Sequence, residues 1–297
     1  MISSHSRGLI MISMTVFLWG VLAIFLKFSL RTLSVHTIIW FRFMFSFLFL
    51  AVYFAIRSPK TLIILKTPPI LGILAGLALA GNYYGFTIGL DLTSPSNVQI
   101  LIQLSPLMVA IIGVVYFKEK LTRIQKTGFL IAFLGFILFY QDQISNLIVT
   151  QDAYFKGNLW VIFAAVSWAV YAVCQKLLLR LWTPLQTNLL IYVVASLFFF
   201  PKMDLHELVL LSWIDWAVLL FMGANTLIAY GALSEALKVL PANQVSAIIV
   251  LNPLITLAVA AVLSRMHVTW MDPENITALG YAGSLLLLAG VGLVVKK

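Results

Sequence analysis

Charged side chains are scarce in this sequence, and their scarcity excludes a water-soluble fold. They make up 10% of the 297 residues, whereas an average soluble domain has about 25%. Apolar residues account for 62% of the chain, and the mean hydropathy is +1.04. The apolar runs are about 20 residues long, as in 70–90, which fits membrane helices and is about twice the length of a β-barrel strand. The sequence therefore predicts an all-α integral membrane protein with the lipid bilayer as its surroundings.

Cysteine and the usual catalytic motifs are also missing. The single cysteine, Cys174, excludes an internal disulfide and a thiolate metal site. The four histidines lie far apart and form no metal-binding motif, and the chain has neither a Walker motif nor a nucleophile elbow. We therefore expect no enzyme activity, no metal and no cofactor. The net charge of +9 is not arranged as a basic stripe on a solvated fold, so nucleic acid is not an expected partner.

Ten spans of about 20 residues result when the chain is divided at proline, glycine and charge clusters. The first starts after Arg7 and is too long for the apolar core of a signal peptide, so we expect it to stay attached. The expected spans are 8–30, 35–56, 69–91, 94–117, 123–142, 157–181, 184–201, 213–238, 241–264 and 275–295.

Basic residues indicate how these spans are oriented, because positive side chains collect on the cytoplasmic side. With a cytoplasmic N-terminus, thirteen lysines and arginines lie on the inner side and four on the outer side. We therefore predict a multi-pass protein of the plasma membrane, the inner membrane of a bacterium, with both termini in the cytoplasm.

An internal repeat divides the chain into two halves. Offsets of 147 to 155 residues align tryptophan, lysine, arginine, tyrosine, proline and glycine residues, which carry more weight than matched leucines. Each half holds five spans, an odd number, so the second half crosses the membrane in the opposite sense, as in many secondary transporters. We expect a first repeat at 1–142, an external linker loop at 143–156 and a second, inverted repeat at 157–297. The aligned pairs include Trp19 with Trp168, Lys27 with Lys176, Tyr83 with Tyr230, Pro106 with Pro253, Gly128 with Gly283 and Gly135 with Gly290.

Several short motifs follow one another in a characteristic order. They are Trp19-Gly20, Phe41-Arg42-Phe43, Pro106 and Lys118-Glu119-Lys120-Leu121-Thr122, the last leading into a glycine-rich span. In length, plan and motif order the chain resembles the EamA-type transporters of the drug/metabolite transporter superfamily. The second half departs from the pattern, because Arg265-Met266-His267-Val268-Thr269 stands in the place of the last motif and has no acid. The resemblance implies a central substrate cavity between the halves and export of amino acids and other small metabolites, or exchange of nucleotide-linked ones.

Amide and hydroxyl side chains within two spans are candidate walls of such a cavity. Gln99 and Gln103 lie one helical turn apart in the fourth span, and Asn243 and Ser246 share a face of the ninth. Amides are unfavourable against lipid, and a mid-helix proline frees a backbone carbonyl, so both faces are expected to point inward. The alternative is that these groups only form hydrogen bonds between neighbouring helices.

Two basic side chains lie inside spans. Arg42 is about seven residues into the second span, where an arginine near the membrane centre costs at least about 2.5 kcal/mol, so an inward position is expected. There it binds a carboxylate or phosphate group, or else it reaches the interface or backbone carbonyls. Lys27 lies near the end of the first span and either joins the site or extends to the interface. Glu235 is an acid that either faces the pathway or belongs to a solvated helix end.

Aromatic side chains supply the remaining candidate surface. Mid-membrane tyrosine and tryptophan need a polar partner, and the alternative for each is packing between helices. The aromatic candidates are Trp19, Tyr83, Tyr84, Trp168, Tyr171, Tyr192 and Tyr230.

These features predict an alternating-access carrier of small amphipathic metabolites, with amino acids as the leading class of substrate. Export is favoured over uptake by the family resemblance. The alternatives are an exchanger of nucleotide-like metabolites and a flippase for lipids or lipid-linked headgroups. The sequence does not decide between a monomer and a homodimer.

Overall fold

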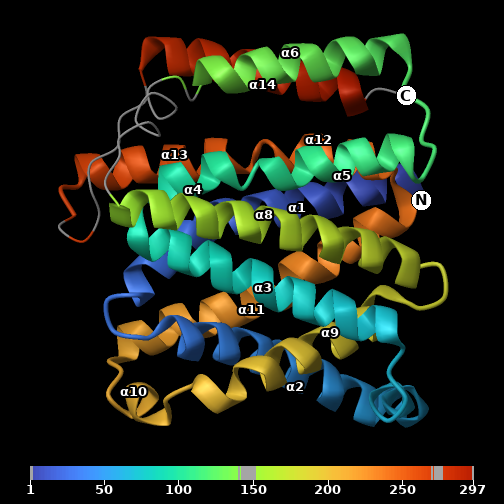
Figure 1. Ribbon diagram of the computed structural model, residues 1–297, viewed down its shortest axis with the longest axis vertical. Coiled ribbons are helices and arrows are strands. Elements are labelled where there is room, and N and C mark those ends of the chain that lie inside the picture. The colour runs from blue at the N-terminus through green and yellow to red at the C-terminus, as the bar shows by residue number, and fades with distance from the viewer. Residues whose placement is uncertain (1–2, 140, 142–151, 269, 271–276, 296–297) are drawn as a thin grey trace.

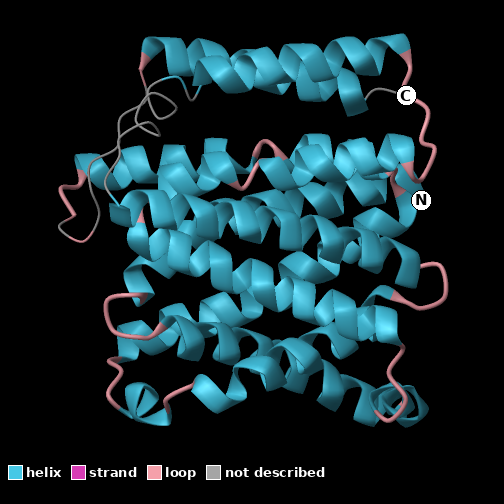
Figure 2. Ribbon diagram, viewed as in Figure 1, coloured by secondary structure: helices cyan, strands magenta, loops and turns pink. Residues whose placement is uncertain are grey.

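The computed structural model describes residues 3–139, 141, 152–268, 270 and 277–295, and within them the chain forms helices and no strands (Figure 1). The helices have roughly parallel axes, and most of the loops lie at two opposite ends of the bundle (Figure 2). Eight helical stretches are long and apolar enough to cross a membrane, and α14 is a shorter apolar helix. The protein is therefore an all-α membrane protein, as predicted, and the count of ten spans stays a prediction.

The helices follow the order of the predicted spans. The first half contains α1 (Ser4–Ser29), α2 (Val35–Arg57), η1 (Pro59–Leu65), α3 (Ile70–Leu92), α4 (Pro95–Leu101), α5 (Leu104–Val115) and α6 (Arg123–Phe139). The second half contains α8 (Asp152–Leu178), α9 (Pro184–Phe199), η2 (Phe200–Lys202), α10 (Leu205–Val209), α11 (Trp213–Val239), α12 (Ala242–Ile249), α13 (Asn252–Arg265) and α14 (Ala278–Val295).

Polar residues explain why two helices begin earlier than expected. Ser3 Oγ accepts a hydrogen bond from Ser6 N at 3.1 Å and so caps α1. The helix therefore begins at Ser4, four residues before the predicted start. α8 begins at Asp152, whose charge favours the N-terminal end of a helix, so residues 152–156 are helical where a loop is predicted. The rest of the predicted linker, 143–151, lies outside the described residues.

Two spans that are predicted as continuous helices are broken near the middle. The fourth span divides into α4 and α5, and the ninth into α12 and α13. Pro106 and Pro253 have no N–H to donate to the carbonyl four residues earlier, so the series of helical hydrogen bonds is interrupted. The backbone closes a tighter turn at each break, such as that from Ser105 N to Ile102 O at 2.9 Å. The prediction of continuous helices is wrong at both places for this reason.

The closest helix pairs each join the two halves of the chain. α1 packs along α11, α2 along α9, α3 along α8, α5 along α12 and α6 along α14. Exchanging the two predicted repeats maps the pair α1 and α11 onto α8 and α3, and the pair α5 and α12 onto α13 and α4, which also pack together. It returns the other two pairs to themselves. This is the pairing that a two-fold relation between the halves would give, and the inversion of the second half stays a prediction.

Glycines allow α6 and α14 to approach closely. A Cβ atom on Gly135 would lie 2.4 Å from Leu287 N, and one on Gly290 would lie 2.3 Å from Ala132 N. Small residues serve the same purpose in many membrane helix pairs. The two helices form the layer at the top of Figure 1, so they cover one side of the bundle.

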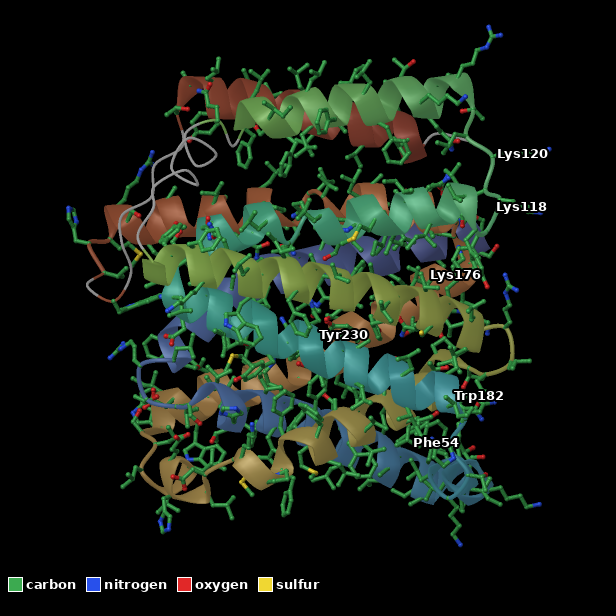
Figure 3. All side chains as sticks on the ribbon, in the orientation of Figure 1. Phe54, Lys118, Lys120, Lys176, Trp182 and Tyr230 are labelled. Carbon is green, nitrogen blue, oxygen red and sulfur yellow. The ribbon has the colours of Figure 1, made fainter. Side chains whose placement is uncertain are left out.

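Both ends of the described chain lie at one end of the bundle. α1 begins and α14 ends there (Figure 1), and Lys118, Lys120 and Lys176 are labelled at the same end in Figure 3. Basic side chains collect on the cytoplasmic side of membrane proteins, and the predicted orientation of this chain rests on that tendency.

Candidate functional site

A cavity of about 80 Å³ lies in the interior of the bundle, where Figure 3 labels Tyr230. Both broken spans contribute to its wall, together with α1, α2, α3, α8 and α11. The lining residues are Trp19, Leu22, Ala23, Arg42, Asn82, Tyr83, Phe86, Thr87, Gln99, Ile102, Gln103, Ser105, Pro106, Trp168, Tyr230, Ile249 and Asn252.

Much of the cavity wall consists of residue pairs that the predicted repeat relates. The offset is 149 for one pair and 147 for three, the same values that align the two halves. The cavity therefore lies where the halves meet, which is where a carrier with two exchanging halves needs its site. The pairs are Trp19 with Trp168, Tyr83 with Tyr230, Ile102 with Ile249 and Ser105 with Asn252.

Four aromatic rings form a continuous part of this wall. The centroid of the Trp19 ring lies 6.1 Å from that of Trp168 and 5.1 Å from that of Tyr230. The Tyr83 ring lies 5.8 Å from the Tyr230 ring. These separations and tilted geometries are favourable for aromatic pairs, so the rings support one another and offer a rigid, largely apolar surface.

Arg42 supplies the positive charge of the cavity and is 2% exposed. Its Nε donates a hydrogen bond to Thr226 Oγ1 at 3.1 Å, and its guanidinium carbon lies 4.3 Å from the centre of the Tyr83 ring. Tyr83 Oη donates to the same threonine oxygen at 3.3 Å. Among the described residues no carboxylate pairs with Arg42, and none lines the cavity. The cavity therefore holds a fixed, uncompensated cation.

Three amide side chains bring unpaired acceptors to the same space. The side-chain oxygens of Gln99, Gln103 and Asn252 are buried and have no hydrogen-bond partner among the described residues. Buried polar groups are nearly always paired, so unpaired ones on a cavity wall indicate a place for a ligand or water. An amide oxygen accepts, and it therefore suits an ammonium or another N–H or O–H donor.

The structure brings most of the predicted site residues together. Tyr171 and Tyr192 lie just behind the wall: the Tyr171 ring is 5.7 Å from the Tyr230 ring, and Tyr192 Oη donates to Thr226 O at 3.2 Å. The predicted residues that line the cavity are Trp19, Arg42, Tyr83, Gln99, Gln103, Trp168 and Tyr230.

Lys27 lies away from the cavity, at the end of α3. Its Nζ donates to Leu90 O at 3.0 Å and to Thr93 O at 3.3 Å. The last carbonyls of a helix have no partner within the helix, and a cation near them is favourable. Lys27 therefore does not line the central cavity, and its extension to the membrane interface stays a prediction.

Three further predicted residues also lie outside the central cavity. Tyr84 packs against Trp160, with ring centroids 5.4 Å apart, because it leaves α3 on a different side from Tyr83. Asn243 lies in the first turn of α12. Ser246 lines a separate apolar groove.

The cavity also contains residues that the sequence analysis does not single out. Asn82 lies on α3 and donates from its side chain to Ala164 O at 3.0 Å, and Thr87 donates to Tyr83 O at 2.7 Å. A lone asparagine in an apolar span is a usable signal, because such a residue rarely faces lipid. Phe86 and Ile249 give no such signal, since an apolar side chain is as favourable against lipid as in the wall of a cavity.

The fold and the cavity define a class of protein: a multi-pass helical membrane protein whose two halves enclose a buried polar site, the organisation of membrane transporters. The chain belongs to the EamA-like transporter family, whose model matches residues 6–141 and again residues 155–295. The family resemblance of the short motifs is therefore confirmed.

Individual relatives agree with this assignment. The chain is 32% identical over 293 residues to the uncharacterized inner membrane transporter YhbE of Escherichia coli, covering 95% of this chain and 89% of that one. It is 28% identical over 278 residues to an uncharacterized transporter of Haemophilus influenzae, covering 93% and 90%. A solved crystal structure has a TM-score of 0.75 at 16% identity, covering 98% and 97%, which shows a common fold. The protein is a multi-pass transporter of the bacterial inner membrane.

Proposed function

We propose that this transporter moves a small amphipathic metabolite with both a negative and a positive group, an amino acid being the leading class, by alternating access around the central cavity. Export is the favoured direction because of the family resemblance. The distribution of basic residues supports a cytoplasmic position for both termini.

The observation that carries this proposal is that one small cavity holds a group that suits a negative charge and other groups that suit a positive charge. Arg42 offers a guanidinium that suits a carboxylate, whereas Gln99, Gln103 and Asn252 offer oxygens that suit an ammonium group. The rings of Trp19 and its neighbours provide an apolar surface for the remainder of the molecule. An amino acid has these three parts.

The size of the cavity limits which substrates fit without a change of conformation. Its volume of about 80 Å³ is enough for a handful of water molecules and is below the roughly 300–1,000 Å³ of most ligand pockets. A substrate larger than the smallest amino acids therefore requires the walls to move apart. A carrier that alternates between states provides that movement.

Transport of a lipid or a lipid-linked headgroup is the second candidate, and one observation favours it. An apolar groove of about 750 Å³ lies beside α5, α6 and α12 and shares Gln103 and Pro106 with the central cavity. A flippase needs such a lateral connection between its polar site and the bilayer.

Two measurements on purified protein separate these candidates. A thermal-shift screen against amino acids and nucleotide-like metabolites identifies binders, because a ligand that binds only the native state raises Tm, and the rise grows with the ratio of ligand concentration to Kd. Proteoliposomes are then tested for uptake of each binder and for scrambling of a short-chain fluorescent lipid. Uptake of an amino acid without scrambling supports the proposal. Folded protein that moves no member of the panel contradicts it, and scrambling alone selects the flippase.

A further inference from the structure

Glu119 connects the two halves of the molecule at the end that carries Lys118, Lys120 and Lys176 (Figure 3). It lies between α5 and α6, in the first half. Its Oε1 accepts a hydrogen bond from Lys176 Nζ of α8 at 2.6 Å, so a carboxylate of the first half meets an ammonium of the second. The side chains are 13% and 16% exposed, so this ion pair is largely removed from water.

The same carboxylate also caps α12. Glu119 Oε1 accepts from Ala242 N at 2.8 Å, and Oε2 accepts from Asn243 N at 3.0 Å. α12 begins after Pro241, which supplies no side-chain cap of its own, so two N–H groups of the helix terminus depend on an acid from the other half. Three charge-assisted contacts thus converge on one side chain.

The surroundings hold Glu119 in this position. Its backbone N donates to Gly113 O at 3.0 Å, and a Cβ atom on Gly113 would lie 2.8 Å from Glu119 Oε2, so a larger residue at this position would displace the carboxylate. Lys118, just before it, has a positive φ of 55°, which turns the chain sharply after α5. Phe117 lies beneath Lys176, with its ring centre 5.0 Å from Nζ.

The opposite end of the bundle has no equivalent contact among the described residues. His267 also has a φ of 55° and lies 149 residues after Lys118, the offset that relates Lys27 to Lys176. Val268 therefore occupies the place of Glu119, two residues later than the alignment of the motifs predicts. Lys27 donates to backbone carbonyls there and pairs with no carboxylate in the part of the chain that the structure describes.

We propose that Glu119 is a latch that holds the Lys176 end of the molecule shut, and that its contacts with Lys176 and α12 must break before substrate can pass through that end. The inference rests on the proposed alternating-access function. On the predicted orientation the latched end faces the cytoplasm, so substrate can enter from that side only after release. Within the described residues the halves are unequal in this respect, since one end has an ion pair and a helix cap from the other half and the opposite end shows neither.

The test measures the width of the latched end by electron spin resonance. Spin labels are attached at Lys120→Cys and Leu181→Cys in a Cys174→Ala background, since both positions are exposed, the first follows Glu119 in the first half and the second follows Lys176 in the second half. Distance distributions are recorded in lipid nanodiscs. We expect a dominant short distance in the parent and an increase of about tenfold or more in the ratio of long to short distances in Glu119→Gln, because several charge-assisted bonds are weakened.

Further variants make the test independent of folding and of general charge effects. Gly113→Ala keeps every charge and displaces the carboxylate, and Lys176→Gln keeps the helix cap and removes the ion pair, so each should also raise the ratio. Glu235→Gln is the matched control, because it breaks the exposed ion pair with Arg7, in which the side chains are 61% and 31% exposed. That variant should leave the distribution unchanged.

The outcomes separate the latch from the proposed function. Unchanged distances in Glu119→Gln, Gly113→Ala and Lys176→Gln, or a parent already dominated by the long distance, overturn the latch even if amino acids are transported. A shift confined to the latch variants supports it, and it does so even if no amino acid in the panel is transported, in which case only the proposed substrate fails.

Discussion

Two buried glutamines in this protein differ in the hydrogen bonds of their side chains, and the difference gives a prediction about binding. Gln103 and Gln125 are each 7% exposed. Gln125 donates to Val294 O at 3.2 Å and accepts from Thr122 N at 3.0 Å, so it joins α6 to α14. The oxygen of Gln103 has no partner and lies at the cavity. The first arrangement stabilises the fold, and the second leaves an acceptor for a ligand.

The two glutamines therefore predict opposite results when each is replaced by leucine. Gln103→Leu should weaken substrate binding by about tenfold or more, since a hydrogen bond to a charged group such as an ammonium contributes about 1.5–3 kcal/mol, and Tm should not fall. Gln125→Leu should lower Tm and leave the affinity of the folded protein unchanged. Affinity and Tm are measured on the same preparations. Equal losses of Tm in both variants would assign Gln103 to packing.

At the scale of helices, the sequence predicts the order and type of elements well and their interruptions poorly. Long apolar runs give the spans because the bilayer sets their length. The breaks before Pro106 and Pro253 are local consequences of proline that a count of span lengths overlooks. Whether a helix is broken or merely bent at a proline depends on the partners that its freed carbonyls find in the folded protein.

The sequence pattern predicts only some of the residues that line the cavity. Trp19, Trp168, Tyr83 and Tyr230 are predicted because they lie well inside their spans, where tyrosine and tryptophan need a polar partner, and all four line the cavity between the halves. Tyr84 is predicted with equal weight and packs elsewhere, since the rotation of α3 against its neighbours is a tertiary property. Contacts between a loop and a distant helix have no periodic signal at all.

The glycines between α6 and α14 give a prediction for the stability of this helix pair. Gly135→Ala should lower the stability by about 1–3 kcal/mol, because its Cβ would lie 2.4 Å from the backbone nitrogen of Leu287. Gly292→Ala, also in α14, has no atom within 4 Å of its Cβ and should be neutral or slightly stabilising, since alanine favours helix. Thermal unfolding of both variants in one detergent tests this. A comparable loss of stability in both would contradict the close-approach argument.

At the scale of the whole molecule, alternating access depends on two halves with opposite orientation. The pairing of helices and the cavity between related residues are consistent with a two-fold relation, and topology measurements test the inversion itself. Cysteine or reporter tags at the N-terminus, between Arg57 and Lys66, and after Lys297 should all report the cytoplasm. A tag in the 143–156 segment should report the outside. Agreement in only one half would remove the inverted repeat and the mechanism built on it.

The most direct measurement of the central claim combines substrate affinity and Tm for Arg42 variants. Arg42→Ala should weaken binding about 10- to 100-fold with little change in Tm, because a charged hydrogen bond to the substrate is lost and the cavity cation has no carboxylate partner in the described protein. Arg42→Lys should restore only part of the affinity, since the planar two-pronged contact is missing. A lowered Tm with normal affinity in Arg42→Ala would contradict the account and make Arg42 a packing residue.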